Sequence, residues 1–403
     1  MVYVINKNGN PLMPCKEAKA AHLLRDGKAK CIKRTPFAIK LLWDCEENVQ
    51  EVVAGMDSGS KSIGCAATAN GEVVYQSEIH IRQDVSKKMT QRSTYRRNRR
   101  SRKTRYRQPR WSNRSNSRRK GRLAPSIRSK IDSHLREKNF VESILPVSKW
   151  IVETAKFDIH KISNPEVEGK DYQNGNQKGF YNTKAYVLDR DGYQCKKCKA
   201  KNVKFNVHHI IFRSEGGTDS PENLITLCES CHGKVHQKEF KIDGKRSKTK
   251  DATEIGIIKS QLKNSFGKFE ETFGYETKFK REILNLSKTH YNDAVSICLE
   301  ENESVKFSDV VYYKRHVCKG DYKQTSGSRS EIEVPTGKLF GLRKFDLVET
   351  SKGTGFVKGK RNSGFFVICD IFWNNLYEVQ VKKNCRRISA RKTTLTEMRM
   401  LKV

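Results

Sequence analysis

The sequence predicts an α+β chain that is divided into several domains. Its 403 residues exceed the usual length of one domain, and 36% hydrophobic residues are enough for more than one packed core. The chain carries 80 Lys and Arg against 45 Asp and Glu, a formal net charge of +35, which indicates a polyanionic partner. Because no run of about 18 apolar residues and no signal-peptide pattern occur, we expect a cytoplasmic protein without a membrane partner.

Residues 1–50 predict a small α+β unit. An apolar strand (VYVI) is followed by a turn, a helix that ends at Gly27, and two strands separated by Pro36. Residues 51–82 contain two β-rich runs, EVVAGMDSGSKSIGCAATA and GEVVYQSEIHI, joined by a turn at 69–71. We therefore expect a hairpin that starts a larger sheet.

An arginine-rich segment follows within residues 83–125. Between Arg92 and Arg122 the chain has 15 Lys or Arg and no Asp or Glu. Because arginine favours helices, we expect a helix over 86–107 with arginines on every face. A solvated basic segment is the alternative, but the run is internal and aromatic residues are interleaved, which favours nucleic-acid contact. The candidate contacts are Arg92, Arg96, Arg97, Arg99, Arg100, Arg102, Arg105 and Arg107.

The rest of the chain mixes helical and strand-rich regions. The expected elements are a helix at 126–145, a strand at 150–159, a polar linker at 160–180, helices within 248–269 and 286–300, and a strand at 276–284 between them. Beyond residue 305 the chain is basic and rich in strands. The expected domains are 1–50, 51–82, 83–125, 126–165, 166–245, 246–304 and 305–403.

Four of the twelve cysteines form two CxxC pairs separated by 29 residues. The pairs are Cys195 with Cys198 and Cys228 with Cys231. Two such pairs supply the four thiolates of a closed structural zinc site. Four unrelated buried cysteines are the alternative, and a redox CxxC would explain one pair but not both. We expect the eight other cysteines to be mostly small buried hydrophobes.

The segment between and after these pairs resembles the HNH (ββα-metal) nuclease family in residue types, order and spacing. The residues concerned are the His208–His209 pair at the end of a strand, Asn223 after a turn, and His232 directly after the second CxxC pair. The resemblance implies that His209 is the general base and that His208 and His232 hold one Mg²⁺ or similar ion. Asn223 would orient the base or its loop. A zinc ribbon that only binds is the alternative, and His236 is expected on the helix surface.

A second set of candidate residues is spread along the chain. Asp57 ends an apolar run near Gly59 and Gly64, which would allow a close backbone approach. Glu153 interrupts a strand, and His290 and Asp293 share a helix face. Taken alone, Asp57 is interpreted as a carboxylate in a turn, and Glu153 as a solvent-facing residue on an edge strand. His290 and Asp293 alone are weak evidence for a functional site. Together and in this order they resemble the RuvC-like branch of the RNase H fold, although Ser58 stands where a Pro or similar small residue is usual. The resemblance implies a mixed sheet with helices and two Mg²⁺ ions between these carboxylates.

The order of these features resembles the IscB family of transposon-encoded, RNA-guided nucleases. An HNH module with Zn knuckles is inserted between the second and third RuvC-like motifs, an arginine-rich bridge helix follows the first, and residues 11–14 read PLMP, the signature of the family's first domain. The resemblance implies a monomeric ribonucleoprotein with a guide (omega) RNA. Its HNH site would cut the guide-paired strand of double-stranded target DNA, and its RuvC-like site the displaced strand. A β-rich C-terminal region would contact the guide RNA and the target-adjacent motif.

Two other functions stay open on the sequence alone. A protein-only HNH homing or resolving endonuclease needs no internal arginine-rich helix of this size. A catalytically idle RNA-binding or DNA-binding scaffold needs neither set of candidate metal ligands.

Overall fold

The structure is a computed structural model that divides into two compact units. The sheet unit comprises Met1–Lys156 and Ile255–Val403, and the Cys/His unit comprises Phe157–Glu254. The described residues are 1–101, 123–154, 182–212, 221–237, 239, 240, 242, 249–300, 305–318, 341–360, 365–380 and 385–401. Within those residues, none of the helices has the length and apolar character needed to span a bilayer.

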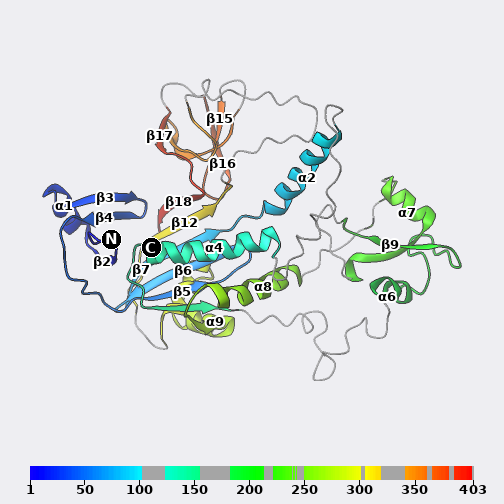
Figure 1. Cartoon of the computed structure of the whole chain (residues 1–403), viewed down its shortest axis with the longest axis horizontal. Helices are drawn as coiled ribbons and strands as arrows, with labels where there is room; N and C mark the ends of the chain where they lie inside the picture. The colour runs from blue at the N-terminus through cyan, green and yellow to red at the C-terminus, as the bar shows by residue number, and fades with distance from the viewer. Residues whose placement is uncertain are drawn as a thin grey trace. The chain divides into compact units, whose positions relative to one another are not determined.

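The N-terminal part of the sheet unit is a four-stranded sheet with one helix (Figure 1), which confirms the small α+β unit. Its elements are β1 (Val2–Ile5), β2 (Pro11–Cys15), α1 (Glu17–Arg25), β3 (Ala29–Arg34) and β4 (Phe37–Leu41), and the strand order is β2-β1-β4-β3. The break at Pro36 separates β3 from β4 as expected.

The main sheet of this unit has seven strands in the order β11-β8-β5-β6-β7-β12-β18. They are β5 (Val53–Asp57), β6 (Ser62–Ala69), β7 (Glu72–His80), β8 (Lys149–Glu153), β11 (Glu270–Thr272), β12 (Val310–His316) and β18 (Thr394–Met400). Strands β5, β6 and β7 form an antiparallel meander, while β8 runs parallel to β5 and β11 parallel to β8. The turn at 69–71 is confirmed, but the run before it is two strands that separate at residues 58–61. The strand expected at 150–159 is described only to Glu153, and the linker at 160–180 lies outside the described residues.

Helices cover both faces of this sheet, so the expected mixed sheet with helices is confirmed. Side chains of α4 (Pro125–Glu142) and α8 (Thr249–Ser265) join the large apolar core on one face. Helix α10 (His290–Cys298) packs on the other face against Ala66 and Val73.

The strand expected at 276–284 is wrong, because this segment is helix α9 (Gly274–Ile283). The segment ETKFKREIL was expected to be strand-like. Instead, the Glu276 carboxylate accepts hydrogen bonds from the Phe273 backbone N–H (3.3 Å) and the Thr272 hydroxyl (2.6 Å), which fixes a helix start. Helix-forming Lys, Arg and Glu residues then continue it.

The region beyond residue 305 is rich in strands, as expected. It is not separate from the main sheet, however, because two of its strands belong to that sheet. Strand β12 pairs in parallel with β7, and β18 pairs with β12, so both extend that sheet. A separate five-stranded sheet has the order β16-β15-β14-β13-β17. Its strands are β13 (Leu347–Thr350), β14 (Gly353–Lys360), β15 (Phe365–Cys369), β16 (Asn375–Gln380) and β17 (Arg386–Ser389).

A buried ion pair joins β12 to β7 and α4. The Lys314 ammonium donates to both Glu137 carboxylate oxygens (2.7 and 2.8 Å) and to the Tyr75 hydroxyl (2.6 Å), and Tyr75 and Ser77 also donate to Glu137. The Lys314 and Glu137 side chains are only 1% and 2% exposed. Because so many partners offset the desolvation of both charges, this cluster favours one register of β12 on the sheet.

The Cys/His unit is a ββα arrangement preceded by a short helix. Its elements are α6 (Thr183–Arg190), β9 (Phe205–His209), the short 3₁₀ helix η3 (Pro221–Asn223), β10 (Leu224–Cys228) and α7 (Glu229–His236). Strands β9 and β10 pair antiparallel, and His208 lies opposite Ile225. The arginine-rich helix of the sheet unit is α2 (Val85–Ser101).

Candidate active sites

Three histidines gather where the end of β9 meets α7. The ligand nitrogens of His208, His232 and His236 all lie within 4.8 Å of one another, and the Nε2 atoms of His232 and His236 are 3.3 Å apart. His232 and His236 are four residues apart on α7, so both face β9. The structure therefore brings the expected ligands His208 and His232 together. His236 is exposed on the helix surface, as expected, but it also belongs to this cluster.

The electrostatics of this cluster suit a divalent cation. His208 is buried, and no hydrogen-bond partner for its Nε2 occurs among the described residues. Burial, followed by the nearby His232 and His236, lowers the pKa of His208 to about 4. Its imidazole is therefore neutral at pH 7. Three imidazole nitrogens at this spacing are a donor set that fits a metal ion.

His209 and Asn223 lie beside this cluster. Successive side chains of a strand point to opposite faces, so His209 points away from the side of β9 that carries His208. The Asn223 side chain accepts from the Ile211 backbone N–H (2.9 Å) and donates to the Ile211 carbonyl (3.0 Å). Asn223 thus holds the backbone two residues after His209 through two hydrogen bonds.

The four cysteines of the CxxC pairs form one cluster. The Sγ atoms of Cys195, Cys198, Cys228 and Cys231 lie within 4.8 Å of one another. Burial opposes ionisation of Cys195, but backbone N–H groups offset it and lower its pKa to about 6. Burial and bonds to the other thiols raise the pKa of Cys231 to about 12. Four thiolates cannot ionise together at this distance without a cation, so the donor set fits zinc.

The sheet unit brings Asp57, Glu153, His290 and Asp293 to one site. Asp57 and Glu153 are directly paired in the parallel register of β5 and β8. The Asp57 carboxylate lies 2.6 Å from His290 Nδ1, and Arg281 donates to Asp293 at 2.7 Å. The Thr277 hydroxyl of α9 donates to Glu153 at 2.6 Å. Residues from three segments that are far apart in sequence therefore meet at the carboxyl ends of two strands.

These carboxylates lie close enough to perturb one another. Burial, followed by the charge of Asp57, raises the pKa of Glu153 to about 7. Burial also raises the pKa of Asp293, while the bond to Asp57 raises that of His290. A site that disfavours its own negative charges in this way suits divalent cations.

Two glycines let α10 approach the sheet closely. A Cβ on Gly64, which pairs with Asp57, would collide with the His290 carbonyl, and one on Gly55 would lie 2.5 Å from the Ala294 carbonyl. The close approach expected at Gly64 is therefore confirmed, and it sets His290 against Asp57.

Sequence reasoning missed a fourth carboxylate at this site. Glu78 of β7 pairs with Gly64, which in turn pairs with Asp57. Burial and the charge of Asp57 raise its pKa. The available signal is that Glu78 interrupts the buried run of β7.

Helix α2 contains the first of the candidate arginines. Arg92, Arg96 and Arg97 are exposed on it. Arg99 and Arg100 also belong to α2, whereas Arg102, Arg105 and Arg107 lie outside the described residues.

Comparison with known proteins identifies two regions. Residues 2–175 match the family described as RRXRR protein, and residues 195–238 match the HNH endonuclease family. The chain is 49% identical to Anaredoxin of Nostoc sp. over 57 residues, which cover 14% of this chain and 75% of that protein. This chain therefore belongs to the proteins with an HNH endonuclease domain.

The chain also resembles part of a restriction enzyme. The chain is 36% identical over 62 residues to the type IV methyl-directed restriction enzyme EcoKMcrA of Escherichia coli, which cover 13% of this chain and 22% of that protein. HNH nucleases use divalent metals, and both the histidine and the cysteine clusters fall within the matched residues 195–238. The RRXRR region contains Asp57, Glu153 and α2, where residues 96–100 read RRNRR. The chain thus joins an HNH endonuclease domain to a basic region with its own acidic site.

Proposed function

We propose that this chain is an RNA-guided DNA endonuclease of the IscB type. The observation that carries the proposal is the combination in one chain of an HNH domain, a basic helix in the RRXRR region, and a separate carboxylate site. A nuclease with one active site does not need the carboxylate site of the sheet unit. A binding scaffold needs neither that site nor the histidine cluster of the HNH domain.

In the HNH domain, His209 takes the proton of the attacking water, for which an imidazole is well matched at pH 7. His208, His232 and His236 hold a divalent cation, and Asn223 keeps the His209 loop in place. Such an ion, when bound, offsets charge on the scissile phosphodiester. This site cuts the guide-paired strand.

In the sheet unit, Asp57, Glu153 and Asp293 would hold two Mg²⁺ ions. The His290 side chain is hydrogen-bonded to the Asp57 carboxylate at the same site. Two ions held this way support in-line attack on phosphorus. Thr277 and Arg281 orient Glu153 and Asp293 by direct hydrogen bonds. This site cuts the displaced strand.

The remaining features supply binding. The guide RNA lies along the arginines of α2, because guanidinium groups bind phosphates bidentately. Base pairing then reads the target DNA while the protein contacts backbone and shape, which accounts for a charge of +35 without a groove-reading motif. The four cysteines hold one structural Zn²⁺, and the working form is a monomeric ribonucleoprotein in the cytoplasm.

The test is to purify the full chain and sequence the nucleic acid that copurifies. We expect RNA of defined length, and Mg²⁺-dependent cutting of duplex DNA that matches a variable part of it. Sequence-specific cutting by protein freed of RNA would indicate a protein-only endonuclease. RNA binding without metal-dependent cutting of matched DNA would indicate a scaffold.

A further inference from the structure

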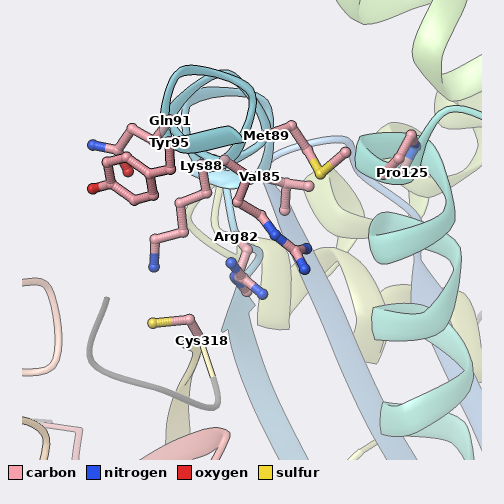
Figure 2. A pocket seen from close by; sticks show the side chains of 9 residues that line it. Arg82, Val85, Lys88, Met89, Gln91, Tyr95, Pro125 and Cys318 are labelled. Atoms are coloured by element: carbon pink, nitrogen blue, oxygen red, sulfur yellow. The ribbon is translucent and has the colours of Figure 1, made fainter. Parts of the chain in front are cut away.

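A cavity of about 270 Å³ lies against the first half of α2 in the sheet unit (Figure 2). The cavity is lined by Val85, Lys88, Met89, Arg92 and Tyr95 of α2, which stand at positions i, i+3, i+4, i+7 and i+10 and so form a stripe along one side of the helix. Cys318, just after β12, and Pro125, at the start of α4, lie across from this stripe. The cavity is therefore framed by three separate elements of one unit.

The apolar part of this stripe is incompletely covered. A helix normally buries such residues against the core, yet the Met89 side chain is 37% exposed among the described residues. Tyr95 is half-buried and also lines the cavity. The wall thus offers a thioether and an aromatic face of the kind on which a flat ring packs.

The polar part of the cavity is cationic. Arg82, Lys88 and Arg92 line it, while Asp84 pairs with Arg82 (2.9 Å) and Lys88 (2.7 Å). Three cations against one carboxylate leave two positive charges, and Asp84 holds two of the cations in position. An anion is the matching ligand for this side of the cavity.

We propose that this cavity binds one unstacked nucleotide of the guide RNA. The base packs against Tyr95 and Met89, and its phosphate pairs with Arg92 and Lys88. The cavity volume is close to the lower end of the range for small-ligand pockets, roughly 300 Å³, which suits part of a single nucleotide. A base held here would add stacking to the phosphate contacts that position the RNA on α2. This inference rests on the proposed function.

The binding test uses full-length protein freed of nucleic acid, with decauridylate (U10) as the probe. We measure its dissociation constant at several KCl concentrations by fluorescence anisotropy. Tyr95→Leu should weaken U10 binding about tenfold at every salt concentration, because stacking is not ionic. Tyr95→Phe should bind within about twofold of the parent, since it keeps the ring. Arg92→Gln should reduce the log–log salt slope by about 0.7, the value for one phosphate on a single strand.

A matched control is Tyr275→Leu, which removes a tyrosine that is 71% exposed on α9, away from the cavity. Its U10 binding should be unchanged. Zinc content and thermal unfolding of every variant should match the parent, which separates lost binding from lost folding.

A second readout locates the RNA. Cys318 is 8% exposed and lines the cavity, whereas Cys31 is exposed on β3. The copurified RNA should slow alkylation of Cys318 by iodoacetamide and leave that of Cys31 unchanged.

Unchanged U10 affinity in Tyr95→Leu, or equal alkylation of Cys318 with and without the copurified RNA, would overturn the proposal. If alanine at Arg96, Arg97, Arg99 and Arg100 still weakens U10 binding in that case, only the cavity assignment fails. If the parent protein neither binds U10 nor copurifies with RNA, the proposed function itself fails.

Discussion

The HNH domain and the sheet unit each assemble a set of candidate metal ligands, but they do so in different ways. Every ligand of the HNH domain lies within residues 195–236, and its ββα arrangement brings them together locally. The site of the sheet unit draws on residues 57, 153, 290 and 293, which meet only because β5 and β8 pair in register and α10 packs closely on β6. Bound cations should therefore contribute most of the folding stability of the HNH domain. Buried packing should contribute most of that of the sheet unit.

The largest expected effect separates the two regions through zinc. Cys198→Ser should unfold the HNH domain, because binding energy at a structural zinc site, about 10 kcal/mol or more, is also folding energy. The sheet unit should stay folded. All four tryptophans lie outside residues 157–254, so tryptophan fluorescence reports the sheet unit alone, and elemental analysis reports zinc. Active protein that contains no zinc would refute this prediction.

The converse change acts on the buried ion pair of the sheet unit. Glu137→Gln leaves the Lys314 ammonium buried without its counter-charge, which should lower the free energy of unfolding by about 3–5 kcal/mol. Urea unfolding followed by tryptophan fluorescence measures it, with zinc content expected to stay unchanged.

The control for that variant is Asp44→Asn, which breaks the exposed pair with Lys7 (3.0 Å) and should change stability by less than about 1 kcal/mol. An equally small effect of Glu137→Gln would show that the pair does not secure β12.

Acid should also distinguish the sheet unit. Burial lowers the pKa of His134 to about 4 and that of His316 to about 3, below the ordinary value of about 6.5. Neutral histidines of this kind contribute stability that is complete above pH 6.5 and is lost as the pH falls toward 4, because only the unfolded chain gains protons there. For His134 the loss is roughly 3 kcal/mol. The thermal unfolding midpoint, followed by tryptophan fluorescence, should decrease as the pH is lowered from 7 to 4.5. His134→Gln should make this decrease smaller. Parallel curves for parent and variant would contradict the assignment.

The same contrast explains what the sequence could predict. The clustering of the four cysteines follows from the spacing of the two CxxC pairs, and the resemblance to the HNH family placed His208 near His232; the structure brings each of these sets together. His236 was missed because a histidine one helical turn after a ligand is indistinguishable in sequence from a surface residue. The position of Glu78 depends on strand pairing across Gly64, which no local pattern encodes. Helix α9 was mistaken for a strand because its start depends on the Glu276 contact with Phe273. Similarly, the pairing of β12 with β7 is stabilised by the buried Lys314–Glu137 cluster. Amino-acid composition alone does not predict this pairing.

The central claim is that the two regions are separate nuclease sites on one RNA-guided enzyme. The most direct measurement is Mg²⁺-dependent cleavage of target DNA, labelled on each strand, by the guide-bound protein with Asp57→Ala or His209→Ala. His209→Ala removes the proposed general base of the HNH site, so the guide-paired strand should be cut about 10²–10⁴ times more slowly. Asp57→Ala should abolish cutting of the opposite strand, and each variant should still nick the other strand at the parent rate. Loss of both cuts in either single variant, with DNA binding intact, would contradict the account and assign all the chemistry to one site.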